Sequence, residues 1–281
     1  MIKIMTLYEN ELSGHKGLAA GHGLSFYICT DAVQLMFDFG SGRDTWENGR
    51  KMNVPFSQIS YGVFSHSHYD HSGGFCYGEA YGFLPSVVWG REEYFFQPKL
   101  SAHPLSQPGM EAYTYMGCGF SKMYALSHTR KQLVCDDQLE LARGCWAVGN
   151  FERTCPWEEI PGRYLRETRT GIVPDGFEDE ICLALDLGEG LAVVAGCSHP
   201  GIVNIVSTIV KRLKKPVRIV VGGLHLAGAG QERIERTARG LRELGVCRAA
   251  VNHCSGEGLE EQFRQQGIEN CRLRVGDCLY L

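Results

Sequence analysis

Four side chains that can bind metal ions lie within one six-residue window: His66, His68, Asp70 and His71. The window follows an apolar run at residues 61–65 that predicts a strand. His66 and His68 are two residues apart, so both face the same way if the backbone stays extended there. Neutral imidazole and carboxylate are the ligands that divalent zinc, iron and manganese accept. The window therefore predicts a cluster of metal ligands at a strand end.

Three further histidines share a position relative to the predicted strands. His199, His225 and His253 each follow an apolar strand pattern and precede a helical one, about one β-α unit apart. Successive strands of one α/β sheet place their carboxyl ends on the same edge, which is where ligands bind in such folds. We therefore expect six of the ten histidines to converge on one rim.

The elements that position these side chains are regular in the first and last thirds of the chain. Alternating apolar patterns bounded by glycine-rich turns predict strands first, and amphipathic patterns ended by glycine or lysine predict helices later. Predicted strands are residues 2–8, 24–29, 34–39, 61–65, 86–90, two within 181–196, 217–223 and 247–252, and residues 272–281 form a closing strand or a hairpin. Predicted helices are residues 43–52, 202–215, 231–245 and 257–267. The pattern predicts one α/β domain over residues 1–281, with a largely antiparallel sheet early and β-α units late.

The segment of about residues 98–175 differs from the rest. It holds six of the ten prolines and shows no sustained helical or strand period. A long irregular insertion of this kind is typical of a lid or binding loop, and the alternative is a packed excursion that touches no ligand. Arg163, Arg166 and Arg169 are spaced three apart, which on a helix would place them along one face. They could form an anion clamp or simply a solvated face.

Composition excludes several classes of protein. The chain has 281 residues, 44% of them hydrophobic and 21% charged, with a formal net charge of -4. This is ordinary globular composition and excludes a disordered chain. No apolar run approaches the roughly 20 residues that cross a bilayer, and no signal peptide is evident, so we expect a cytoplasmic protein without membrane contact. A mildly acidic chain without a dense basic block also argues against nucleic-acid binding.

Cysteine is abundant, at 12 residues, but no CxxC pair occurs. Cys29, Cys182 and Cys247 lie inside apolar runs. We interpret most of the cysteines as small buried hydrophobic residues in a reducing compartment. A disulfide framework is the alternative.

The HxHxDH pattern of residues 66–71, with later histidines at strand ends, resembles the metallo-β-lactamase superfamily. The resemblance implies an αββα sandwich with a mono- or dinuclear metal site at one edge. Several glycine-rich segments resemble those of one branch of the superfamily. That branch includes the dihydropterin-forming synthase of methanopterin biosynthesis and many metal-dependent hydrolases. The segments are residues 20–28, 35–42, 64–74, 190–205, 220–226 and 252–256.

The superfamily pattern implies a role for each side chain of the rim. His66 and His68 would bind the first metal ion, and Asp70 and His71 the second. His253 resembles the last histidine ligand, on the second ion. Asp38 resembles an early aspartate that braces the site without binding metal, although an aspartate of a simple turn would look the same.

Two departures from the superfamily pattern concern the first ion. The usual mid-chain histidine is missing, because His103 and His128 lack a glycine-rich context. Cys197 stands where a bridging aspartate is usual. His199 could supply the missing imidazole to the first ion. Cys197 could be a ligand or a small residue beneath the site, and a thiolate there would favour zinc or ferrous iron over magnesium.

The predicted function is that of a metal-dependent hydrolase, or a hydrolase-like lyase, which uses two divalent transition-metal ions and activated water. Zinc is the first choice, and iron and manganese are the alternatives. Asp70 would orient the nucleophile, and His225 would protonate the leaving group, as a similarly placed histidine does in related phosphodiesterases. We expect a small-molecule substrate such as a phosphate ester, a cyclic phosphate or a pterin, and the oligomeric state stays open. The rival interpretation is an iron- and thiol-based redox or metal-handling protein.

Overall fold

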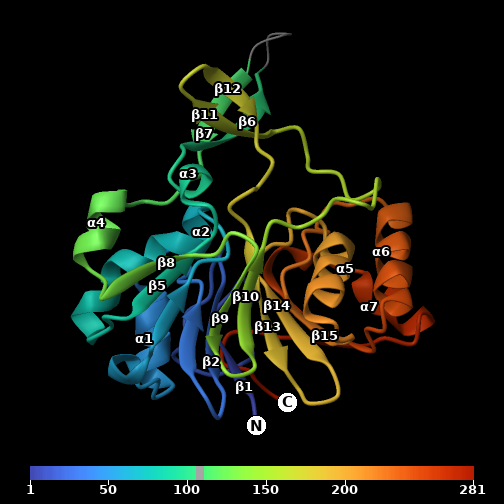
Figure 1. The fold of residues 1–281 in the computed structure, drawn as a ribbon, viewed down its shortest axis with the longest axis horizontal. Helices are drawn as coiled ribbons and strands as arrows, with labels where there is room; N and C mark the ends of the chain where they lie inside the picture. The colour runs from blue at the N-terminus through green and yellow to red at the C-terminus, as the bar shows by residue number, and fades with distance from the viewer. Residues whose placement is uncertain (106–110) are drawn as a thin grey trace.

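The computed structural model describes residues 1–105 and 111–281. Within these residues the strands form two seven-stranded sheets that pack face to face and a separate four-stranded sheet. Figure 1 shows helices on the outer face of each large sheet and the small sheet standing above one end of the sandwich. The arrangement is the predicted αββα sandwich, and both chain termini lie at the end away from the small sheet.

The first large sheet is antiparallel over its early strands and parallel from β3 onward. In spatial order its strands are β18 (Cys278–Tyr280), β1 (Lys3–Tyr8), β2 (Ser25–Cys29), β3 (Gln34–Phe37), β4 (Tyr61–Val63), β5 (Ser86–Trp89) and β8 (Lys131–Val134). The sheet is therefore mixed, and the turn that carries the histidine window leaves it at the end of the parallel strand β4.

The second large sheet contains the β-α units predicted for the last third. In spatial order its strands are β17 (Glu269–Arg272), β16 (Arg248–Val251), β15 (Val217–Gly222), β14 (Leu191–Ala195), β13 (Ile181–Asp186), β10 (Cys145–Gly149) and β9 (Gln138–Ala142). Strands β14 to β17 pair in parallel. The carboxyl ends of these four strands therefore meet at one edge of the sheet.

The helices agree with the sequence prediction in the regular parts of the chain. They are α1 (Asp44–Lys51), α2 (Tyr69–Ser72), α3 (Glu92–Phe95), α4 (Lys122–Ser127), α5 (Ile202–Leu213), α6 (Gln231–Glu243) and α7 (Leu259–Gln265). Short 3-10 helices are η1 (Phe56–Gln58), η2 (Gly73–Tyr81) and η3 (His253–Ser255).

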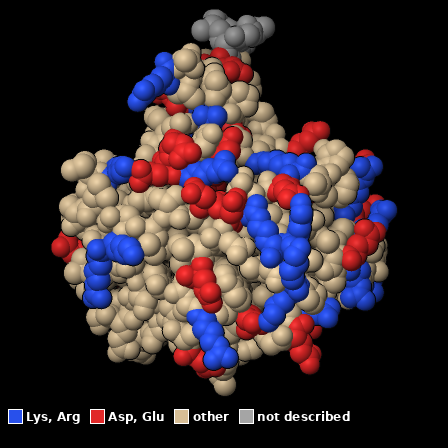
Figure 2. All heavy atoms as spheres, viewed as in Figure 1, with Lys and Arg blue, Asp and Glu red and all other residues tan. Residues whose placement is uncertain are grey.

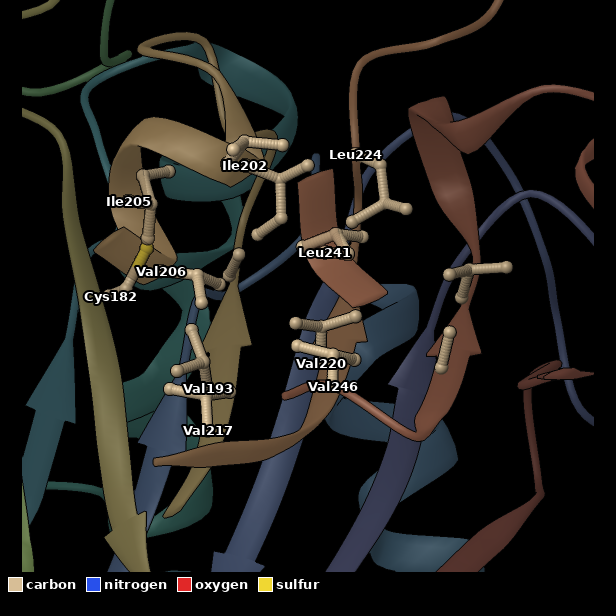
Figure 3. Close-up of a cluster of buried hydrophobic side chains, with 14 of the residues drawn as sticks. Cys182, Val193, Ile202, Ile205, Val206, Val217, Val220, Leu224, Leu241 and Val246 are labelled. Atoms are coloured by element: carbon tan, nitrogen blue, oxygen red, sulfur yellow. The ribbon is translucent and has the colours of Figure 1, made fainter. Parts of the chain in front are cut away.

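Strand β14 illustrates why the sandwich has a buried layer on each side of the second sheet. Successive side chains of a strand point to opposite faces. Val193 packs in a cluster with Ile205 of α5 and Leu241 of α6 (Figure 3), whereas Val194 packs in a second cluster with Phe37 of the first sheet. A strand buried on both faces reads as a continuous apolar run, as residues 191–195 do.

The segment of residues 98–175, predicted to be irregular, is instead rich in strands. Strand β8 joins the first large sheet, and β9 and β10 join the second. The small sheet consists of β12 (Gly171–Pro174), β11 (Tyr164–Thr168), β6 (Lys99–Pro104) and β7 (Glu111–Tyr115). Its strands lack an apolar alternation because they are largely solvated, and every residue of β7 is exposed.

The arginine trio of this segment does not lie on a helix. Arg166 is in strand β11, and Arg163 and Arg169 flank that strand. Because side chains alternate along a strand, residues three apart face opposite sides, so the predicted shared face is wrong. All twelve cysteines of the described structure are free, so the alternative of a disulfide framework is wrong. The interpretation of most of them as buried residues is also wrong, because the buried ones are only Cys118, Cys135, Cys145, Cys182 and Cys197. No helix among the described residues is long and apolar enough to cross a bilayer.

Candidate metal centre

The six predicted ligands come together from turns that leave both large sheets. His66 and His68 follow β4, and the short helix α2 carries Asp70 and His71. In the second sheet, the last residues of β14, β15 and β16 are register partners, Ala195 with Gly222 and Gly222 with Val251. The loops that bear His199, His225 and His253 therefore start side by side.

The first group consists of three histidine rings. The ring centroids of His66, His68 and His199 lie 4.7 to 5.1 Å apart, and all three side chains are buried. His66 Nε2 and both ring nitrogens of His199 have no hydrogen-bond partner among the described residues. Buried polar atoms without a partner are costly, so these nitrogens are available to bind a ligand.

The second group consists of Asp70, His71 and His253. His71 Nε2 lies 3.2 Å from His253 Nε2, and Asp70 Oδ2 lies 3.4 Å from His253 Nε2 and 3.7 Å from His71 Nε2. Burial acts to raise the pKa of Asp70, but His71, His22 and His253 together hold it well below its usual range. Asp70 is therefore a carboxylate at neutral pH, and its Oδ1 has no hydrogen-bond partner among the described residues.

Asp38 braces the second group, as the resemblance implies. Its Oδ2 lies 2.7 Å from His71 Nδ1, and its carboxylate also accepts hydrogen bonds from the Ser65 backbone N–H and hydroxyl. The contact with Asp38 orients the ring and leaves His71 Nε2 pointing at His253. Carboxylate–histidine pairs of this kind fix the orientation of metal-binding imidazoles.

Cys197 lies between the two groups. Its Sγ is 3.1 Å from His71 Nε2, and it can share a metal ion either with His66 and His199 or with His71 and His253. Burial raises the pKa of the Cys197 thiol well above its usual value, and a bound cation would instead favour the thiolate. The sulfur therefore lies within reach of an ion in either group.

The donor set fits transition-metal ions. Burial lowers the pKa of His68 to about 3 and that of His253 to about 4, and it holds those of His66 and His199 well below normal. These imidazoles are therefore neutral, which is the form that binds metal. Several neutral imidazoles with one carboxylate and one thiol suit zinc or ferrous iron, and they do not suit magnesium or calcium.

His225 lies on the rim but belongs to neither group. Its Nε2 is 3.1 Å from the Tyr164 hydroxyl, and the Tyr164 oxygen is 2.9 Å from a guanidinium nitrogen of Arg163. Because Arg163 can only donate, the Tyr164 hydrogen is left to donate to His225 Nε2. Burial, Arg163 and Arg233 lower the pKa of His225 to about 4. His225 is therefore neutral at pH 7 unless a bound anion raises its pKa.

The structure adds residues that sequence reasoning missed. His22 Nε2 lies 3.1 Å from Asp70 Oδ2, so His22 can join Asp70 and His253 around an ion. The Phe177 ring stacks on His199 with centroids 3.7 Å apart, and the Glu180 carboxylate accepts hydrogen bonds from the His199 backbone N–H. The glycine-rich phrase around His22 was a signal for that residue. No pattern marked Phe177 or Glu180.

A pocket of about 260 Å³ opens onto the two groups. Its wall includes His68, Asp70 and His253, together with Met116, Arg163 and Tyr164 from the 98–175 segment. Part of that segment therefore lines the site. Its movement as a lid stays a prediction.

Comparisons with known proteins agree with this fold. The structure is similar to that of Tm1679, described as a metal-dependent hydrolase of the β-lactamase superfamily, with a TM-score of 0.83, 26% identity and coverage of 100% of this chain and 99% of that one. A diphosphatase of the PhnP family shares the fold at 13% identity, with a TM-score of 0.53 and coverage of 100% of this chain and 98% of that one. These neighbours define a metallo-β-lactamase fold.

One curated relative narrows the family. It is the 7,8-dihydropterin-6-methyl-4-(β-D-ribofuranosyl)-aminobenzene-5′-phosphate synthase of Methanocaldococcus jannaschii, 30% identical over 98% of this chain and 95% of the relative. No family model matches the sequence. The chain belongs to the metallo-β-lactamase superfamily and, within it, to the family of this synthase.

Proposed function

We propose that this protein is a metal-dependent enzyme of the hydrolase type that acts on a small phosphate-bearing molecule. The observation that carries the proposal is the pair of ligand groups on either side of Cys197, open to one pocket. His66, His68 and His199 would hold one divalent ion, and Asp70, His71 and His253 a second, with zinc as the first choice. A bound divalent ion supplies Lewis acidity and makes water a nucleophile near neutral pH.

The chain's own residues orient the reactants. The free Oδ1 of Asp70 can accept a hydrogen bond from the attacking water. His225 and Tyr164 face the same pocket and form a hydrogen-bonded pair that can pass a proton to a leaving group. An anionic substrate beside His225 would raise its pKa from about 4 and so favour the imidazolium form that donates a proton.

The family supports a pterin as the first substrate to test. The relative from Methanocaldococcus jannaschii is named for a product that contains a dihydropterin and a 5′-phosphate. We propose that this chain makes or cleaves a bond next to a phosphate or diphosphate group of a similar molecule. Met116 and Tyr164 give the pocket an apolar side against which a flat heterocycle can pack.

The test is a substrate screen with zinc-loaded protein. It includes bis(p-nitrophenyl) phosphate, p-nitrophenyl phosphate, a lactone, a thioester and phosphorylated dihydropterins, each with and without added zinc, iron or manganese. The control is the His66→Ala/His68→Ala variant, which should lose at least the first ion. We expect metal-dependent turnover of a phosphate compound by the wild type and none by the variant. Equal turnover by both proteins, or full metal content in the variant, would contradict the proposal.

A second candidate is an iron- and thiol-based redox function. Cys254 Sγ lies 3.4 Å from Cys197 Sγ, so two thiols adjoin the ligand groups. Protein purified without oxygen and without chelator distinguishes the two functions. Visible absorption bands and iron as the main metal favour the redox function, whereas a colourless zinc protein favours the hydrolase type.

A further inference from the structure

A second pocket adjoins the one that opens onto the metal ligands. It has a volume of about 400 Å³ and shares Arg163, His225 and Ala227 with the metal pocket. We call it the outer pocket. Its remaining wall includes Glu159, Gly228 and Arg233. A ligand with its reacting end at the metal centre can therefore extend past His225 into this space.

Two guanidinium groups line the outer pocket without a carboxylate partner. Within the described residues, neither Arg163 nor Arg233 forms an ion pair. Among residues 1–105 and 111–281, the Arg233 side chain donates one hydrogen bond, to the Glu159 carbonyl oxygen at 2.9 Å, and its Nε is buried without a partner. The nearby Glu158 carboxylate is engaged elsewhere, because it accepts the backbone N–H groups that begin α5.

The backbone adds positive potential on the same side. Gly228 and Ala229 line the pocket just before α6, and that helix begins at Gly230 without a side-chain cap. The uncapped first turn of a helix presents N–H groups and the positive end of the helix dipole. The acidic residue in this turn, Glu232, is paired with Arg236 at 2.6 Å.

The segment between β10 and β11 forms one side of the outer pocket, with Glu159, Pro161 and Arg163. Figure 1 shows the segment between β10 and β11 reaching over to the end of α6, where Arg233 contacts Glu159. Figure 2 shows Lys and Arg side chains gathered below the small sheet on this face, with acidic side chains among them. Any selection for an anion must therefore come from the local arrangement of Arg163, Arg233 and the helix end.

We infer that the outer pocket binds a phosphate monoester group at the far end of the substrate, held by Arg163, Arg233 and the first turn of α6. The inference rests on the proposed function, because it assumes that the other end of the same molecule reacts at the metal centre. Two planar guanidinium forks beside helix N–H groups suit the several oxygens of a phosphate.

The test measures binding of phenylphosphonate, a phosphate monoester analogue that cannot be hydrolysed, to zinc-loaded protein by titration calorimetry. Arg233→Gln removes one guanidinium from the outer pocket. Arg239→Gln is the matched control, because Arg239 is exposed on the same helix and lines neither pocket. Unfolding temperature and zinc content are measured for each variant, so that misfolding is recognised.

We expect Arg233→Gln to weaken phenylphosphonate binding at the outer pocket by roughly tenfold or more. Arg239→Gln should leave phenylphosphonate binding unchanged, both at the outer pocket and at the metal centre. Binding at the outer pocket should persist after zinc is removed by chelation, which separates it from the metal centre. Equal affinities in the two variants, or no binding to the zinc-free protein, would overturn the inference. Metal-dependent turnover of bis(p-nitrophenyl) phosphate by the wild type tests the proposed function separately, so that function would stand even if the outer pocket failed its test.

A comparison with inorganic phosphate shows whether the outer pocket binds a phosphate group carried by the substrate or free phosphate. If the outer pocket serves a phosphate carried by the substrate, phenylphosphonate should bind the zinc-free protein at least as tightly as inorganic phosphate does. Inorganic phosphate binding tenfold more tightly than phenylphosphonate would contradict a substrate-borne group and assign the pocket to free phosphate.

Discussion

His225 differs from the other five histidines of the rim because its Nε2 pairs with the Tyr164 hydroxyl. Its pKa of about 4 keeps it neutral until an anion binds. We expect His225→Ala to leave zinc content unchanged and to lower turnover by about 10² to 10⁴-fold. The loss should shrink for leaving groups of low pKa, which need no proton. A loss independent of the leaving group, or one reversed by excess zinc, would contradict the role of proton donor.

Cys197 is the residue at which this chain departs most from the superfamily pattern. If its sulfur bridges the two groups, Cys197→Ala should weaken zinc binding by at least about tenfold. Cys254→Ala is the matched control, since its sulfur lies 3.4 Å from that of Cys197 but belongs to neither ligand group with His66 or His71. Competition with a chromophoric chelator measures both affinities. Equal zinc affinity in the wild type and Cys197→Ala would show that the thiol is only a neighbour of the metals.

At the scale of elements, the loops that carry His199 and His225 can approach because Gly222 ends β15. Gly222 has a φ of +106°, and a Cβ there would lie 2.0 Å from the Ala195 carbonyl oxygen. We expect Gly222→Ala to lower the free energy of unfolding by about 3 kcal/mol and to reduce zinc affinity. Gly230→Ala is the control, because a Cβ at Gly230 meets open space. Denaturant unfolding of both variants measures the difference, and equal stability would contradict the close approach.

Elements with a strong local pattern could be predicted from the sequence, and elements fixed by distant pairing could not. The amphipathic residues 202–215 and 231–245 correspond to α5 and α6, and the apolar run at 191–195 to β14. The small sheet depends on pairs such as Lys99 with Arg166, which no local period encodes. The same distinction holds in the site. The histidines at strand ends could be predicted, whereas Tyr164 of the 98–175 segment and Phe177 just after it reach the site through long-range pairing.

At the scale of the whole molecule, the metal centre would join the two halves of the sandwich. His66 and His68 leave the first sheet, and His199 and His253 leave the second. A ligand that binds only the folded state stabilises it by about 2.7 kcal/mol when the free ligand concentration is a hundredfold above the dissociation constant. We therefore expect chelation to lower the unfolding temperature by about 5–10 °C, and added zinc to restore it. Calorimetry of the chelated and reloaded protein checks this, and an unchanged unfolding temperature with metal verifiably removed would contradict it.

The most direct test of the central claim is anomalous X-ray diffraction from crystals of the zinc-loaded protein, recorded on both sides of the zinc absorption edge. The account predicts two zinc peaks on either side of the Cys197 sulfur. One should lie among His66, His68 and His199, and the other among Asp70, His71 and His253. Zinc peaks only at other places on the chain, or none within bonding distance of these side chains, would contradict it.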